Sequence, residues 1–146
     1  MIQLTLNQLR AAEPCIGGWR AALKGRRKRK ADDVSFALEE LIQSNGIQET
    51  LWAIKAVQDQ ERELRHLARV AAECIAPCCS REISALIRSK NSIEIIYQTG
   101  MTCCGCAADW AAVTAFHPDV RWAARSASLF AVNLNPDNLE IIKNAL

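Results

Sequence analysis

The chain has little of what turn-rich β folds require, because its 146 residues include only 6 glycines and 4 prolines. It has no apolar run close to the roughly 20 residues that span a bilayer. Residues 1–4 lack the charged segment, followed by an apolar one, that begins a signal peptide. We therefore expect a helical, cytoplasmic protein with no membrane partner.

The sequence also lacks a recognisable catalytic constellation. It has no glycine-rich phosphate-binding loop with a Walker-type lysine, and the Gly17-Gly18 pair is too short to supply one. His66 and His117 are its only histidines, and we expect both to be ordinary surface residues. We therefore predict that the protein is not an enzyme and uses no cofactor.

Seven cysteines are an odd number, which argues against a complete set of disulfide bonds. Cys78, Cys79, Cys103 and Cys106 lie in two clusters and offer the four thiolates of a tetrahedral zinc site. No histidine lies near either cluster in the sequence, and cysteine is also a common small core residue. Buried or incidental thiols are therefore our first interpretation, with a zinc site and redox chemistry as alternatives.

Apolar residues recur at helical spacing along most of the chain, and no segment has a convincing strand pattern. The clearest stripe belongs to a helix expected from Asp59 to about Ala76: Leu64, Leu67, Ala68, Ala71, Ala72 and Ile75. Other helices are expected around residues 5–12, 34–44, 51–57, 80–87, 92–100, 102–116, 118–131 and 139–146, with a short helical turn at Trp19. Thr5, with Gln8 three residues on, is expected to cap the first of these helices, and Ser80 and Ser92 are expected to cap theirs. The pattern predicts one all-α domain over residues 1–146, an irregular bundle or short α-solenoid of about eight or nine helices.

Helix ends and buried aromatic residues can be assigned from the same pattern. Asn45-Gly46, Gly100 and Asn135-Pro136 are expected to end helices. Three of the four tryptophans lie on apolar helical stripes and are expected in the core: Trp52, Trp110 and Trp122. Trp19, beside a glycine pair, is the best candidate for an exposed anchor that contacts a partner.

One segment carries most of the information about function. Six of the seven residues from 24 to 30 are basic: Lys24, Arg26, Arg27, Lys28, Arg29 and Lys30. These are six of the 18 basic residues, and the remaining 12 are fewer than the 16 acidic residues. No packed core needs such a run, so we expect a basic loop at about 24–31 that is either solvated or bound to an anionic partner.

Residues 38–46, 51–57, 64–74 and 107–112 read LEELIQSNG, LWAIKAV, LRHLARVAAEC and AADWAA. Together they resemble a family of small helical immunity-like proteins from phages, prophages and bacteria. The resemblance covers roughly residues 36–130, and that family has no established catalytic residues to carry over. It implies a mobile-element protein that acts by binding.

Three hypotheses about function follow. The first is a binding protein that occludes the surface of a toxin or a host defence complex, as an anti-CRISPR inhibitor does, using Trp19 and the basic run. The second is a nucleic-acid-binding accessory protein that uses the same run. The third is an enzyme or zinc-dependent module built on the cysteines.

Overall fold

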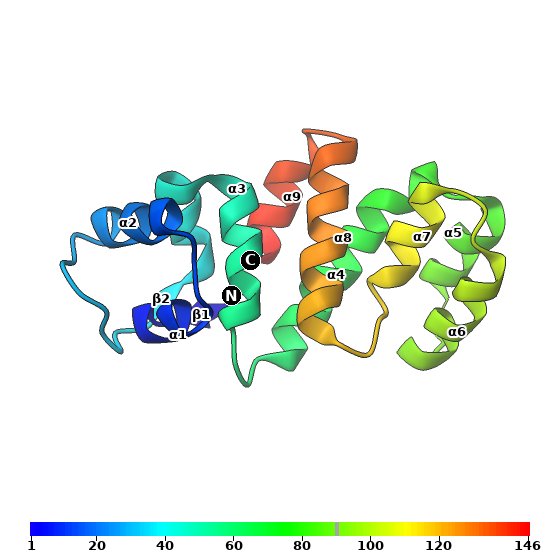
Figure 1. Ribbon diagram of the computed structural model, residues 1–146. Coiled ribbons are helices and arrows are strands. Elements are labelled where there is room, and N and C mark those ends of the chain that lie inside the picture. The colour runs from blue at the N-terminus through cyan, green and yellow to red at the C-terminus, as the bar shows by residue number, and fades with distance from the viewer. Residues whose placement is uncertain (90) are drawn as a thin grey trace. The chain divides into compact units, whose positions relative to one another are not determined.

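The computed structural model describes residues 1–89 and 91–146, apart from the side chain of Cys103, and these residues are mostly helical (Figure 1). Nine α-helices lie within the described residues, so the prediction of an all-α fold with eight or nine short helices is confirmed. None of the helices described is long and apolar enough to cross a membrane.

The chain divides into two compact units, one of residues 1–63 with Leu146 and one of residues 64–145. The prediction of a single domain over residues 1–146 stays a prediction. The elements of the first unit are β1 (Gln3–Leu4), α1 (Leu6–Ala11), α2 (Ile16–Gly25), β2 (Phe36–Ala37), a 3-10 turn η1 (Leu38–Leu41), α3 (Ile42–Trp52) and a second 3-10 turn η2 (Ala53–Ala56).

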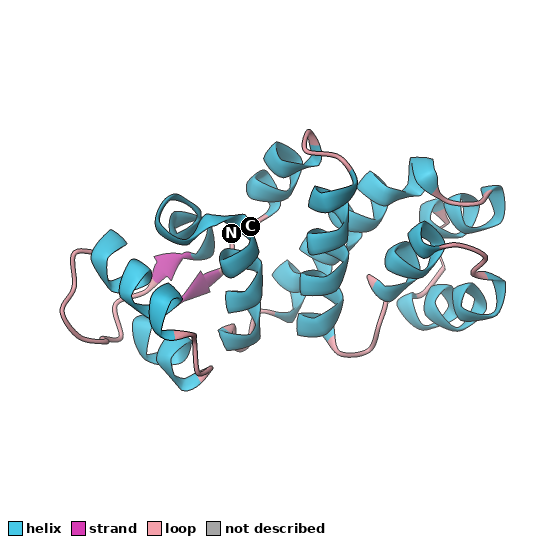
Figure 2. Cartoon of the chain, turned by 45° about the horizontal axis from the view of Figure 1, so that its top comes forward, coloured by secondary structure: helices cyan, strands magenta, loops and turns pink. Residues whose placement is uncertain are grey.

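A two-stranded antiparallel sheet joins β1 to β2, with Leu4 opposite Phe36 (Figure 2). The predicted helix from Val34 to Ser44 is therefore wrong, because Phe36 pairs with β1 and its side chain enters the core. Helical structure begins instead with η1 and α3. Long-range strand pairing outweighs local helix propensity here. The spacing of apolar residues within a segment does not show which distant segment it will pair with.

The helix ends of the first unit follow local chemistry. Thr5 caps α1 in a capping box with Gln8, as predicted. Gly46 interrupts the regular helix, as its sequence indicates, because its φ of 76° and ψ of 168° are not helical. A new helical turn follows directly, so α3 continues past Asn45-Gly46 to Trp52 with a kink.

Helix α2 packs closely on α3 through a face of small residues. Ala22 is fully buried, and a Cβ atom at Gly25 would lie only 2.6 Å from Ser44 Cβ. The Asn45 side chain donates a hydrogen bond of 2.8 Å to the Gly18 carbonyl oxygen. This close contact fixes which face of α2 points inward.

In the second unit each helix from α5 to α9 contacts the next one in the chain. Its elements are α4 (Glu61–Ile75), a 3-10 turn η3 (Ala76–Cys78), α5 (Arg81–Arg88), α6 (Ile93–Cys103), α7 (Ala107–Thr114), α8 (Val120–Leu134) and α9 (Asn138–Ala145). The apolar stripe predicted for α4 is buried as expected, although α4 begins at Glu61 and not at Asp59.

Serine caps in the second unit are confirmed, because the side chains of Ser80 and Ser92 accept backbone hydrogen bonds at the starts of α5 and α6. Gly100 does not end α6, contrary to prediction. It lies inside the helix, and a Cβ atom there would lie 2.5 Å from Val113 Cγ2. Helices α6 and α7 therefore approach closely at this glycine. Helix α7 begins at Ala107 and not at Thr102.

Two tryptophans predicted in the core are largely exposed. Trp110 and Trp122 keep 46% and 43% of their surface accessible, and Trp52 is half-buried. Alanines take the buried positions of the same helices, as Ala112 on α7 and Ala123 on α8 show. Helices that approach through alanine leave no room between them for an indole.

The α2–α3 contact predicts that Gly25→Ala lowers the free energy of unfolding by about 1–3 kcal/mol, because the new methyl group must displace Ser44. Gly17→Ala in the same helix is the matched control, since a Cβ atom there meets nothing within 4 Å. We expect the control to stabilise by up to about 1 kcal/mol through helix propensity. Urea unfolding followed by circular dichroism measures both, and equal effects would contradict the close contact.

Candidate binding surface

The basic run spans the end of α2 and the loop that follows it. The N–H of Lys28 donates to the Leu23 carbonyl oxygen at 2.9 Å, and that of Arg27 donates to the Lys24 carbonyl oxygen at 3.0 Å. This pair of bonds is a Schellman motif, which closes a helix with one residue in the left-handed conformation. Arg27 is that residue, with a φ of 54°, where glycine is usually found. The first turn of the basic loop is therefore an ordered structure.

Two of the six cations are used within the protein. The Arg26 guanidinium pairs with the Glu40 carboxylate and lies 4.4 Å from the centroid of the Phe36 ring. Lys28 Nζ lies 2.7 Å from Asp32 Oδ2, and the hydrogen bond from Lys28 lowers the pKa of Asp32 below its usual value. These contacts hold the two ends of the loop.

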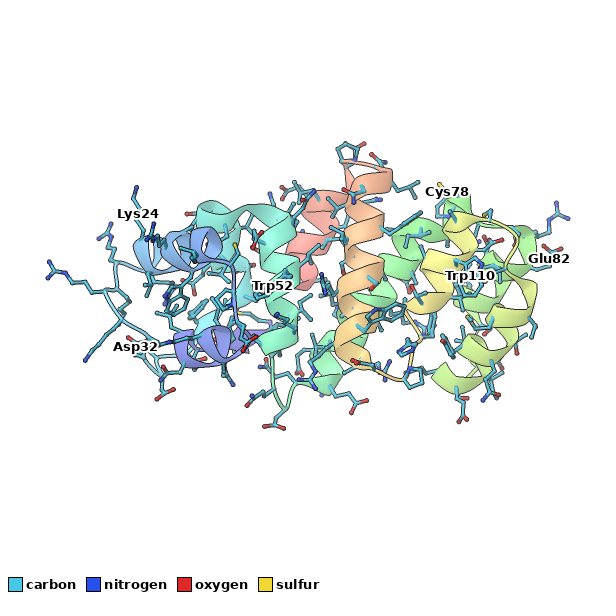
Figure 3. The ribbon with its side chains drawn as sticks, viewed as in Figure 1. Lys24, Asp32, Trp52, Cys78, Glu82 and Trp110 are labelled. Carbon is cyan, nitrogen blue, oxygen red and sulfur yellow. The ribbon has the colours of Figure 1, made fainter. Side chains whose placement is uncertain are left out.

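The other four cations form a group that we call the basic tip: Lys24, Arg27, Arg29 and Lys30. All four are exposed, and in the part of the chain that the structure describes none of them forms an ion pair. Figure 3 shows the side chain of Lys24 extending away from α2. The basic tip is thus an uncompensated group of positive charges around the end of α2.

Trp19 is half-buried and lies on α2 before the basic tip. It lines an open hollow of about 460 Å³ with Arg10, Glu13, Pro14, Ile16 and Arg20. We had not predicted a role for Ile16, Arg10 or Arg20. The sequence did offer one indication of this hollow. Ile16 and Trp19 are three residues apart in a helix whose inner face consists of small residues.

The candidate zinc ligands do not form a metal site in the residues described. Cys78 and Cys106 are exposed, Cys79 is half-buried, and the side chain of Cys103 lies outside the described atoms. Among the described side chains, no three His, Cys, Asp or Glu residues are placed to hold a metal ion. Burial, with a smaller effect from the nearby Asp109 carboxylate, raises the pKa of Cys79 to about 12. This thiol therefore stays protonated at neutral pH and is a poor nucleophile.

Asp109 has a structural role beside these cysteines. Its side chain is 1% exposed and accepts hydrogen bonds from the N–H groups of Ser80 at 2.8 Å and Gly105 at 3.0 Å. Burial alone raises the pKa of Asp109, but these hydrogen bonds outweigh it and hold the pKa below its ordinary value. The carboxylate ties the starts of α5 and α7 together.

The two histidines lie in different surroundings. His66 is exposed on α4, as predicted. His117 is half-buried in the turn before α8, where its ring contacts Tyr97 and Trp122 and its Nδ1 accepts a 3.0 Å hydrogen bond from the Asp119 N–H. These contacts hold the His117 ring in the turn and explain its position without a role in binding.

Asp109 generates a prediction about pH. Because its folded pKa lies below the ordinary value of 3.8, its contribution to stability is complete above that pH and is lost as the pH falls through the lowered pKa. We expect Asp109→Asn to destabilise by about 1–3 kcal/mol at pH 7, since the amide keeps one acceptor oxygen and one of the two N–H groups loses its partner. The difference from the wild type should narrow below about pH 4.

Urea unfolding at a series of pH values tests this prediction. Asp119→Asn is the matched control, because Asp119 caps α8 at an exposed position and asparagine caps equally well. The control should change stability by only a few tenths of a kcal/mol. A difference between Asp109→Asn and the wild type that stays constant down to pH 2 would contradict the role given to the carboxylate.

Comparison with known proteins adds no family to this picture. No protein-family model matches the chain, and no curated protein or solved structure shows significant similarity to it. The argument about function therefore depends on the geometry of the basic tip and of α2.

Proposed function

We propose that this protein is a non-enzymatic binding protein of a phage or other mobile element. It neutralises a partner protein, a toxin or a host defence complex, by occluding an acidic surface of that partner. The basic tip, defined by Lys24, Arg27, Arg29 and Lys30, makes the contact. The resemblance to immunity-like proteins supports the mobile-element origin as an expectation from sequence.

The observation that carries this proposal is the conformation of Arg27. A non-glycine residue in the left-handed region costs roughly 1–2 kcal/mol, and a glycine there would avoid the cost. Glu13 and Asp59 have the same left-handed conformation, and Arg27 differs from them in lying among three other cations that repel it. Local rules of this kind are usually broken where a binding function requires it.

Order in the turn adds to the argument. The Schellman bonds and the Arg26 and Lys28 pairs fix the backbone before any partner arrives. A preorganised group of charges loses less conformational entropy on binding than a disordered basic tail. Such a group also raises the association rate with an acidic surface at low salt.

Nucleic acid is the second candidate partner, because the same four cations can neutralise phosphates. Trp19 is the one aromatic residue of α2, and a platform for single strands stacks successive bases on several aromatic side chains. A single strand is therefore a poor match, and the salt dependence of binding distinguishes a duplex from a protein partner. If nucleic acid were bound through these four contacts, the logarithm of affinity would fall with a slope of up to about −3.6 against the logarithm of salt concentration.

Affinity purification of the tagged full chain from its host cells, with and without nuclease, tests the proposal. We expect a stoichiometric protein partner that survives nuclease treatment. The partner should be lost when the tip is reversed in charge by Lys24→Glu, Arg27→Glu, Arg29→Glu and Lys30→Glu. Recovery of only nuclease-sensitive and salt-sensitive material would contradict the proposal and support the nucleic-acid alternative.

The matched control makes the same charge change at four exposed arginines outside the basic tip: Arg62→Glu, Arg81→Glu, Arg88→Glu and Arg121→Glu. This variant should retain the partner, because net charge alone does not position a contact. Both variants should keep the helical circular dichroism spectrum of the wild type. Equal loss of the partner in the two variants would show that the basic tip has no special role.

A further inference from the structure

We infer that the outer face of α2 is a specificity-determining docking surface for an acidic segment of the partner, with one apolar side chain of that segment in the hollow beside Trp19. This inference rests on the proposed function and adds the chemistry of the bound segment. It extends the interface from the basic tip along the whole of α2.

Helical spacing separates α2 into two faces. Gly18, Ala22 and Gly25 lie at i, i+4 and i+7 and face α3. Ile16 and Leu23 lie on the other side of α2, and Trp19 lies on its flank, about 100° from Gly18 around the helix axis. The close glycine contact leaves α2 no freedom to turn this second face inward.

The outer face is apolar and incompletely covered. Ile16 is 71% exposed, and both Trp19 and Leu23 are half-buried. A partly exposed tryptophan with Arg20 next to it has the residue types that are enriched in contact hot spots, and Ile16 adds exposed apolar surface. The hollow between α1 and α2 has room for a side chain of leucine size.

Charge determines which segment fits. Arg10 and Arg20 line the hollow and are exposed, and Lys24 follows Arg20 by one helical turn. Glu13 also lines the hollow, but Arg10 and Arg20 outnumber it, so the net charge of the lining is positive. Within the described part of the chain, no ion pair is formed by Arg10, Arg20 or Lys24. An apolar side chain flanked by carboxylates complements this arrangement.

Other occupants fit less well. A second copy of the chain would bring Arg10, Arg20 and Lys24 against the same cations of its neighbour, and like charges in contact oppose association. A nucleic acid has no apolar side chain for the hollow and would leave Ile16 exposed. The complementary ligand is therefore a segment of protein.

Nuclear magnetic resonance titration of the ¹⁵N-labelled full chain tests this inference. The probes are a synthetic peptide with one leucine between six acidic residues and the same peptide with alanine in place of leucine. We expect the leucine peptide to shift the indole N–H signal of Trp19 and the amide signals of α2. It should bind at least about fivefold more tightly than the alanine peptide, because only leucine fills the hollow.

Two variants and a control sharpen the test. Trp19→Ala should weaken binding of the leucine peptide by about tenfold or more, as the loss of a hot-spot residue does. Arg20→Glu, at an exposed position that the fold does not need, should also weaken it. Trp110→Ala removes a more exposed indole from the second unit and should leave the affinity unchanged.

The outcomes separate this inference from the proposed function. Equal affinity for the two peptides, no effect of Trp19→Ala and Arg20→Glu, or no binding at millimolar concentration would overturn the docking surface. The proposed function would still stand if charge reversal of the basic tip removed the partner in the purification experiment. If charge reversal of the basic tip also left the partner bound, the docking surface and the proposed function would both be overturned.

Discussion

The close contact between α2 and α3 is the constraint on which the proposed binding surface depends. Small residues let the two backbones approach, and Asn45 reaches across to the Gly18 carbonyl oxygen. Because Ala22 and Gly25 must face α3, Ile16 must lie on the far side of α2 and Trp19 on its flank. The basic tip lies at the C-terminal end of the same helix, where Lys24 belongs to its last turn. A packing requirement inside the first unit thus places the features that we assign to binding.

Electrostatics and backbone conformation act together at the end of α2. Arg26 and Lys28 are held by Glu40 and Asp32, so these two cations contribute to the fold. Arg27 has a strained left-handed conformation and no ion-pair partner among the described residues. The turn is ordered while its outward charges stay uncompensated. This combination is expected where stability has been given up for recognition.

Much of the fold could be predicted from the sequence, because serine caps and the apolar stripe of α4 are local signals. The strand at Phe36 could not be predicted, since its stability comes from pairing with Leu4 far away in the chain. The helix end predicted at Gly100 is wrong for a similar reason, because the close contact of Gly100 with Val113 outweighs the propensity of glycine to end a helix. Of the candidate site, the basic run was evident, but its division into paired and unpaired cations depends on Glu40 and Asp32. The hollow beside Trp19 also needed the packing of α1 and α2.

The central claim is that the chain accepts a less stable turn in order to hold cations for a partner. Arg27→Gly tests it most directly, in urea unfolding and in binding to the purified partner. The account predicts a gain of about 1 kcal/mol in the free energy of unfolding, together with weaker binding. Arg29→Gly removes the same charge at a residue without positive φ and should weaken binding without the gain in stability. Lower stability of Arg27→Gly, or undiminished binding, would contradict the claim.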